Sequence, residues 1–387
     1  MRPITALSVI VSALLPFAAV AAQDVTLPCD KNTEQTLNST APDEVVRISA
    51  FTPARPIEKV TPSYPKHVAK LGGEGWVKMS YVIDTEGNVV DPVIDDFAGS
   101  QKFKRKALNA LKQWKFAPAM KDGKPTQQCH QSVQFDFVLN QRGGARRSFV
   151  SQYKAIDVLI QQDELETARH ELTALHESEN RNRYENAWLW NLDATLAAKE
   201  GDESRELASL VRTLSSAKTH TREHATFDDD YMAYIHQRLF VLNVKAGQYK
   251  YALRSADALK AMDGQSARYE ALRPFIDEVN TLIASEQPIA VPVTIDESGS
   301  RFHILARQGF GFSDIRGNLT TVEVRCDSHR EKYTVAENVT WLVPESWGEC
   351  RLLMEGDQGT AFRLIEVNAA AVTNITQFSS GADSPGH

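Results

Sequence analysis

The sequence lacks the short motifs that mark the common enzyme families. It contains no G-x-S-x-G nucleophile elbow, no P-loop and no G-x-G-x-x-G phosphate-binding turn. Its four cysteines form no C-x-x-C pair and no Cys/His spacing typical of a zinc site. We therefore expect no catalytic residues, no cofactor and no bound metal, and the sequence favours a binding or structural role.

A basic stripe is also missing, which argues against nucleic-acid partners. The 387 residues carry a net charge of −7, whereas nucleic-acid-binding domains are usually basic along one face. The short basic clusters at 102–106 and 142–147 are typical of a solvated helix start and a linker. With 42% hydrophobic and 24% charged residues the chain has the composition of folded protein, and its length favours two or three domains.

Only the N-terminus carries an apolar run near the length of a membrane span. Residues 1–22 combine one arginine, an apolar stretch, Pro16 and a small-residue end, which predicts a signal peptide cleaved after Ala21 or Ala22. The alternative is an uncleaved membrane anchor. A cleaved chain would reach a compartment that permits disulfides. The polar residues 23–44 that come next are too poor in apolar side chains to fold alone.

The four cysteines, Cys29, Cys129, Cys326 and Cys350, admit three full pairings. Cys326 and Cys350 are close in sequence and flank a strand-rich stretch, so we expect a disulfide between them. That pairing leaves Cys29 for Cys129.

Residues 45–142 are predicted to form an α+β domain. Residues 76–83 have the alternating apolar pattern of a strand, and 89–97 follow as a second strand after a turn. Residues 103–114 have the spacing of an amphipathic helix. The stretch 131–139 closes the region with apolar residues at alternate positions, the period of a half-buried strand.

Residues 148–286 have a different composition, with Pro274 as their only proline and apolar residues at helical spacing. Segments 163–168 and 247–252 share a turn residue, a large apolar residue two positions later and an alanine three after that. Segment 201–206 is a weaker copy between them. The pattern predicts α-helical hairpin repeats that resemble the tetratricopeptide family, with a longer spacing than is usual there.

Residues 288–372 are predicted to form a small all-β module, either a sandwich or a barrel. Six short β-forming runs are separated by Gly, Asn, Asp and Ser: 301–306, 319–326, 331–336, 339–344, 349–355 and 361–367. The glycines of GFGF at 309–312 predict a turn between strands. Residues 373–387 are expected to be disordered.

The α+β region resembles a known family in the order and spacing of several motifs. The matching positions are Tyr64-Pro65, Glu74-Gly75, Asp84, Gly87-Asn88-Val89, Trp114-Lys115-Phe116, Pro118-Ala119, Gly123-Lys124-Pro125 and the strand 133–139. Together they resemble the C-terminal domain of TonB, the periplasmic protein that couples inner-membrane energy to outer-membrane receptors. The resemblance implies the fold more strongly than the activity.

The resemblance also implies a partner and a binding edge. TonB-like domains bind an extended segment of an outer-membrane receptor as an added strand beside their last strand, so that main-chain hydrogen bonds supply the affinity. In this chain the implied edge comprises Gln131, Val133, Gln134, Phe135, Asp136 and Phe137, with Thr61 and Tyr64 alongside. The alternative is that this edge pairs with the chain itself or with a second copy of it.

Features expected of a TonB transducer are missing. The apolar segment has no histidine, and no proline-rich spacer follows it. About forty residues precede Tyr64 after cleavage, and fully extended they reach at most about 140 Å. We therefore expect a periplasmic protein of a Gram-negative envelope that binds transport receptors, with an inner-membrane anchor as the alternative. The rival function is an envelope scaffold that contacts proteins or peptidoglycan, and no particular oligomeric state is favoured.

Two further patterns bear on function. The stretch 220–224 matches the zinc-peptidase signature H-x-x-E-H, but it lies in a polar insertion and is better explained as a solvated helix end. If Cys29 pairs with Cys129, residues 25–30 would be tied close to the binding edge and could cover it as a built-in pseudo-ligand. This second pattern is a hypothesis drawn from the placement of the two cysteines.

Overall fold

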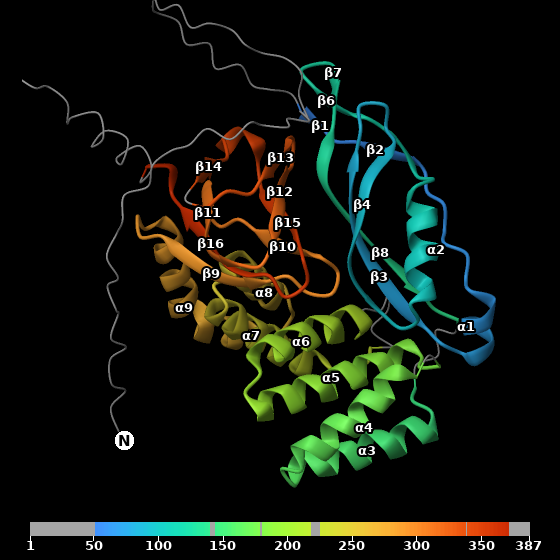
Figure 1. Ribbon diagram of the computed structural model, residues 1–387. Helices are drawn as coiled ribbons and strands as arrows, with labels where there is room; N and C mark the ends of the chain where they lie inside the picture. The colour runs from blue at the N-terminus through green and yellow to red at the C-terminus, as the bar shows by residue number, and fades with distance from the viewer. Residues whose placement is uncertain (1–50, 140–143, 179, 218–224, 338, 371–387) are drawn as a thin grey trace, which may run out of the picture.

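The structure is a computed structural model that describes residues 51–139, 144–178, 180–217, 225–337 and 339–370. The predicted signal peptide, the polar segment 23–44 and the tail 373–387 lie outside the described residues. Figure 1 shows helices α3 to α9 in an arc, with an α+β module (blue to teal) standing over its middle part and a β module (orange to red) over its end.

The α+β module has the predicted combination of strands and helices. Its elements are β1 (Phe51–Thr52), β2 (Arg55–Glu58), α1 (Lys66–Leu71), β3 (Gly75–Ile83), β4 (Val89–Ala98), α2 (Lys102–Leu111), β5 (Lys115–Ala117), β6 (Ala119–Lys121), β7 (Lys124–Thr126) and β8 (Gln128–Phe137). The central sheet is antiparallel with strand order β4-β3-β8, and β2-β5 and β1-β6-β7 form smaller sheets. The short helix α1 was not expected from the sequence.

The two faces of the central sheet differ in their cover. On the face that packs against α2, which we call the front face, alternate residues of β3 such as Val77, Met79 and Tyr81 join Phe103 of α2 in one apolar core. This arrangement results from the period-2 pattern of β3 and the helical spacing of α2. The opposite face, the back face, carries Trp76, which is also fully buried, because α6 lies against β3 and β4 there.

The helical region consists of antiparallel hairpins. Its elements are α3 (Arg147–Gln161), α4 (Leu165–Glu177), α5 (Arg183–Glu200), α6 (Glu203–Ala217), α7 (Asp229–Lys245), α8 (Tyr249–Lys260) and α9 (Ser266–Ala284). The three sequence copies each contain the start of a hairpin's second helix, at Leu165, Glu203 and Tyr249. The prediction of α-helical hairpins in this region is therefore confirmed.

The β module contains two four-stranded sheets around one core. Its strands are β9 (Ile289–Thr294), β10 (Ser300–Ile304), β11 (Gly309–Arg316), β12 (Leu319–Cys326), β13 (Arg330–Thr334), β14 (Thr340–Leu342), β15 (Cys350–Gly356) and β16 (Ala361–Val367), with a 3-10 turn at Glu345–Trp347. The strand orders are β10-β15-β12-β13 and β14-β11-β16-β9. Because both sheets contribute to the same apolar core, the module is a sandwich.

The GFGF stretch is a strand, and its prediction as a turn is wrong. Phe310 and Phe312 are buried in the sandwich core. A Cβ on Gly309 would lie 2.5 Å from a Val367 methyl group, and one on Gly311 would lie 2.6 Å from a backbone oxygen of a neighbouring segment. These glycines allow close approach between chain segments rather than a reversal of direction.

Candidate functional site: the outer edge of strand β8

Within the described residues, strand β8 has a hydrogen-bonded strand partner on one side only. It pairs antiparallel with β3, with Val133 opposite Met79. No strand in the described part of the chain pairs with its other edge. The strand spans Gln128–Phe137 rather than the predicted 131–139, because Leu139 is exposed and its N–H donates to the Glu74 carboxylate at 2.7 Å instead of extending the sheet.

The backbone groups that point outward from β8 can be identified. The Tyr64 hydroxyl lies 3.5 Å from the carbonyl oxygen of Phe137, so that carbonyl points away from β3. Backbone groups alternate in direction along a strand. The N–H and C=O groups of Gln131, Val133 and Phe135 therefore lie on the same outward edge as those of Phe137.

The front side of β8 is fixed by aromatic packing. Phe137 stacks on Phe103 with ring centroids 4.2 Å apart, and Phe135 meets the Trp114 ring edge-on at 5.3 Å. Both phenylalanines are buried. Their side chains are consequently engaged in the core, leaving only backbone atoms for a partner.

The back side of β8 is fixed by polar contacts with the helical region. The Gln134 side-chain amide donates to the carbonyl oxygen of Ser215 in α6 at 3.2 Å and to the Asp136 carboxylate at 2.8 Å. Asp136 also pairs with Arg183 at the start of α5 at 3.3 Å. Four of the predicted edge residues, Gln134, Phe135, Asp136 and Phe137, thus have their side chains engaged on one or the other face of the strand.

The segment before α1 is anchored within the α+β module at two points. The carbonyl oxygen of Val60 accepts a hydrogen bond from the Trp114 indole at 2.9 Å, and the Tyr64 hydroxyl donates to the carbonyl of Gly73 at 2.6 Å. Thr61, between these anchors, is exposed. Burial, and then the negative charge of Glu74, raise the pKa of Tyr64 well above its usual value, so its hydroxyl remains a hydrogen-bond donor.

Glu74 ties the end of β8 to the helical region, a role that no local pattern predicted. Its carboxylate accepts from the backbone N–H groups of Leu139 and Arg183 at 2.7 and 2.9 Å. Its own N–H donates to the carbonyl of Arg181 at 2.7 Å, and its carbonyl accepts from the Asn186 amide at 3.0 Å. Its place in the Glu74-Gly75 motif was the only sequence signal that marked it.

The other end of β8 approaches the β module. His130 Nδ1 lies 3.8 Å from the carboxylate of Asp327, just beyond β12. Cys129 is buried and disulfide-bonded, but its predicted partner Cys29 and the predicted pseudo-ligand 25–30 lie outside the described residues. The predicted Cys326–Cys350 disulfide is confirmed, with the two residues opposite each other in β12 and β15.

Ion pairs connect β4 to both other modules. Arg351 of β15 lies 3.4 Å from Asp95, and Arg330 of β13 lies 2.5 Å from Asp91. Arg212 of α6 donates to both carboxylate oxygens of Asp96 at 3.0 to 3.1 Å. Sequence patterns missed these pairs, because their members are far apart in the chain and each looks like an ordinary solvated charge.

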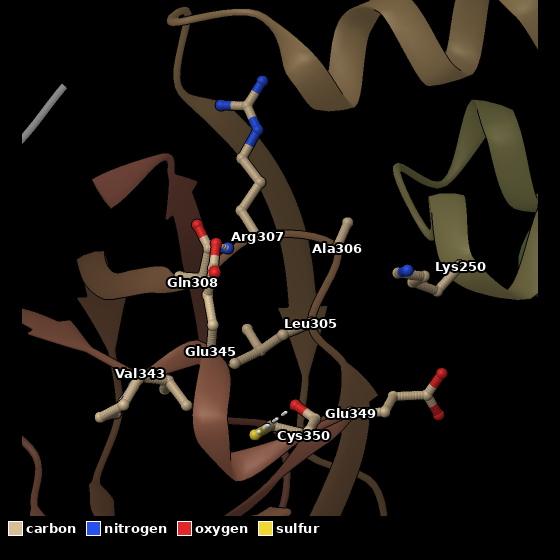
Figure 2. Close-up of a pocket in the computed structure, with 11 residues that line it drawn as sticks. Lys250, Leu305, Ala306, Arg307, Gln308, Val343, Glu345, Glu349 and Cys350 are labelled. Carbon is tan, nitrogen blue, oxygen red and sulfur yellow. Dashed lines mark hydrogen bonds between the residues drawn. The ribbon is translucent and has the colours of Figure 1, made fainter. Parts of the chain in front are cut away.

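A hollow of about 320 Å³ lies between α8 and the β module, lined by residues such as Lys250, Glu345 and Cys350. Figure 2 shows Arg307 extending from it toward a neighbouring helix. That guanidinium donates to the carbonyl oxygens of Leu282 and Ile283 at the end of α9. The buried arginine therefore joins α9 to the sandwich.

The described residues show neither a metal cluster nor a membrane-spanning helix. No group of three or more His, Cys, Asp and Glu side chains is placed there to hold an ion. The H-x-x-E-H stretch 220–224 lies outside the described residues. Among the described helices, none combines the length and the apolar character needed to cross a bilayer.

Residues 60–139 match the family model described as Gram-negative bacterial TonB protein C-terminal. Protein TonB of Vibrio cholerae is 37% identical over 73 residues, which are 19% of this chain and 30% of that protein. Protein TonB of Yersinia enterocolitica is 31% identical over 96 residues, which are 24% of this chain and 38% of that protein. The chain thus spans about a third of the length of these relatives.

Two solved structures are similar to the same region. The solution structure of the Pseudomonas aeruginosa TonB C-terminal domain is 27% identical, covers 23% of this chain and 90% of that one, and has a TM-score of 0.21. The TonB2 protein from Vibrio anguillarum is 35% identical, covers 28% of this chain and 99% of that one, and has a TM-score of 0.19. The family match and the curated relatives lead to one conclusion: residues 60–139 of this chain are a TonB C-terminal domain.

Proposed function

We propose that this chain is a non-enzymatic periplasmic protein of a Gram-negative envelope that binds outer-membrane transport receptors. The receptor contributes an extended segment, which adds to the outer edge of β8 as a fourth strand of the sheet β4-β3-β8. The bound segment is held by main-chain hydrogen bonds and therefore places little demand on its own side chains.

The outer edge of β8 is the observation that carries this proposal. The strand is ten residues long and has one strand partner among the described residues. An unpaired edge of this length is a template for another chain. The TonB C-terminal domain to which the edge belongs makes an outer-membrane receptor the expected partner.

Both faces of β8 are anchored, which favours binding at the edge. Phe135 and Phe137 are held in the front core, while Gln134 and Asp136 are held by α5 and α6. Such a strand loses little conformational freedom when a partner pairs with it, so more of the contact energy appears as affinity.

Val133 offers a direct test. Proline has no backbone N–H, so Val133→Pro removes an outward donor, and an edge strand tolerates proline there. The matched control Val133→Ala shortens the same side chain but keeps the N–H. We expect the full-length wild-type chain and Val133→Ala to capture an outer-membrane receptor from a solubilised envelope extract, and Val133→Pro to lose that capture.

Receptor capture by Val133→Pro is compared with capture by Val133→Ala to test strand addition at β8. Circular dichroism first confirms that both are folded. Equal capture of the same receptor by both variants would contradict strand addition at β8. Recovery of peptidoglycan-associated material alone, with no receptor, would contradict the transport role.

A scaffold that recruits another envelope protein is the second candidate, favoured by an aromatic row in the helical region. The row crosses the first helices of the three hairpins and the bend before α7, and it comprises Tyr153, Tyr184, Trp188, Phe227, Tyr231 and Tyr234. The Trp188 indole N–H is buried without a hydrogen-bond partner in the described structure, and Tyr234 is 47% exposed. Capture of a protein that persists in Val133→Pro and is lost in Tyr234→Ala would favour this scaffold role.

A further inference from the structure

A cavity of about 400 Å³ lies where the three modules meet. Trp76 and Asp95 line it from the α+β module, Val211 and Tyr251 from the helical region, and Phe302 from the β module. Its size is that of a small-molecule site. None of the residues that line the cavity belongs to β8, so its ligand is distinct from the strand proposed to add to that edge.

One wall of the cavity is apolar. Leu207 and Val211 of α6 lie in it together with Leu239 of α7. Such a wall suits a hydrocarbon or aromatic group and offers nothing to a bare inorganic ion.

Another part of the lining is cationic, with Arg254 of α8, Arg301 of β10 and Arg351 of β15. Arg351 is only 8% exposed, and its Nε atom is buried without a hydrogen-bond partner in the described structure. Its guanidinium stacks on Phe302 at 3.8 Å. A guanidinium carries five N–H donors, so the single carboxylate paired with Arg351, that of Asp95, does not use all of them.

Arg301 and the Tyr251 hydroxyl are further hydrogen-bond donors among the residues that line the cavity. Arg301 reaches a carboxylate only at 3.5 Å, that of Asp296, whereas Arg254 pairs with Glu349. Tyr251 lies on the same face of α8 as Arg254, three residues away, and none of the hydrogen bonds of the described residues uses its hydroxyl as donor. Burial raises the pKa of Tyr251, so the hydroxyl stays protonated.

The acidic groups in the cavity are already engaged. Asp96 receives two donors from Arg212. Asp95 accepts from the Ser80 hydroxyl at 2.7 Å as well as from Arg351. Each of the three arginines has one carboxylate partner, but a guanidinium offers five N–H donors, so the remaining donors favour a ligand that brings acceptor oxygens of its own.

We propose that this cavity binds a small organic anion whose carboxylate or phosphate group is held by Arg301, Arg351 and the Tyr251 hydroxyl. The apolar part of the ligand lies against Leu207 and Val211 of α6. Because all three modules line the cavity, the ligand stabilises their joined arrangement by mass action.

Phenyl phosphate and phenylacetate are suitable probes, since each joins an aromatic ring to one of the two anionic groups. Benzyl alcohol is the neutral counterpart. Titration calorimetry with the full chain at constant ionic strength should give saturable binding of at least one anion and none of benzyl alcohol. The stronger of the two anions identifies the ligand as a phosphate or a carboxylate.

Variants of the cationic part of the lining locate the binding. Arg301→Gln removes a half-exposed arginine and should weaken affinity by about tenfold or more, and Tyr251→Phe by about threefold to tenfold. Arg363→Gln is the matched control, because Arg363 is also exposed and paired with one aspartate, Asp314, at 3.3 Å. It should bind like the wild type.

Three results would overturn the proposal. The first is the absence of saturable binding for both anions, and the second is equal binding of benzyl alcohol. The third is an affinity that is unchanged in both Arg301→Gln and Tyr251→Phe. Tyr251→Phe keeps the ring and its packing, so it gives a result even if Arg301→Gln is poorly folded.

Discussion

The front and back faces of the sheet β4-β3-β8 are stabilised by different kinds of contact. The front face buries aromatic rings such as Phe103 and Phe137 against α2. On the back face, the Trp76 indole donates to the Ser216 hydroxyl at 2.9 Å, and charge pairs join β4 to the other modules. The first face resembles the core of a small domain, and the second resembles a protein–protein interface.

The difference shows how a small domain is joined to the rest of a larger protein. The front-face contacts all lie within the α+β module. The back-face partners are far apart in sequence, with Asp96 and Arg212 separated by 116 residues and Asp95 and Arg351 by 256. Removal of the module from the chain would keep the front core and expose Trp76, so experiments on β8 need the full chain.

Loss of a front-face ring should have the largest effect. Phe103 is fully buried between Tyr64 and Phe137, so Phe103→Ala leaves a cavity and should lower the free energy of unfolding by about 3–5 kcal/mol. Urea denaturation followed by tryptophan fluorescence measures the change. A loss below about 1 kcal/mol would mean that α2 does not stabilise the sheet.

Loss of a back-face carboxylate should come next. Asp95→Ala leaves Arg351 buried without its acidic partner and should cost about 3 kcal/mol. In the double variant Asp95→Ala/Arg351→Met no charge is left unpaired, so most of that loss should be recovered. Limited proteolysis tests whether the modules separate, and a double variant no more stable than Asp95→Ala would contradict this account.

A smaller effect is expected from Ser80, which lies on β3 and donates its hydroxyl to Asp95 at 2.7 Å. Ser80→Ala removes one hydrogen bond to a charged group and should cost about 1–2 kcal/mol. Combined with Asp95→Ala it should add little, because the acceptor is already gone. A double-mutant cycle in urea measures the coupling, and strict additivity would show that the two residues act independently.

The smallest effect concerns pH and should be confined to the back-face side of the module. Burial, and then the nearby positive charge of Arg351, lower the pKa of His130, although Asp327 opposes the shift. The unfolded chain therefore binds the proton more readily, and stability should fall as pH drops below about 6.5. On the front face, burial raises the pKa of Tyr81 to about 12, so it does not titrate in that range.

Replacement of His130 tests whether its protonation causes the predicted loss of stability at low pH. His130→Asn should show a smaller loss of stability between about pH 7.5 and about pH 5.5 than the wild type, measured by urea denaturation at both values. Phe103→Ala should keep the pH dependence of the wild type, because it changes only the front face. An unchanged slope in His130→Asn would assign the pH dependence to another group.

Several features could be predicted from local patterns and were confirmed. The alternation in 76–83 predicted β3, the spacing in 103–114 predicted α2, and the cysteine spacing predicted the Cys326–Cys350 disulfide. Local periodicity predicts such strands and helices because one face of each element is buried against a neighbouring element. The same local reasoning failed at 309–312, where glycines that allow close packing suggested a turn.

The candidate edge could be predicted in position but not in its surroundings. Residues 131–137 do form the last strand of the module, and Tyr64 does reach Phe137. The anchoring of Gln134 by Ser215, and of Leu139 and Arg183 by Glu74, could not be predicted. Their partners lie in other modules, and a sequence pattern contains no information on which distant segment will lie opposite.

The resemblance to the TonB family implied which strand offers an edge. The local order of amino acids was sufficient to predict the kinds of module and the elements of the front core of the α+β module. Those features depend on periodic burial, which is encoded locally in the chain. The covered back face, the pairing of β-module arginines with aspartates of β4, and the cationic cavity where three modules meet became apparent only in the folded molecule. A charged or polar side chain gains a specific partner only when a distant segment packs against it and excludes water. Which segment does so is decided by the tertiary structure.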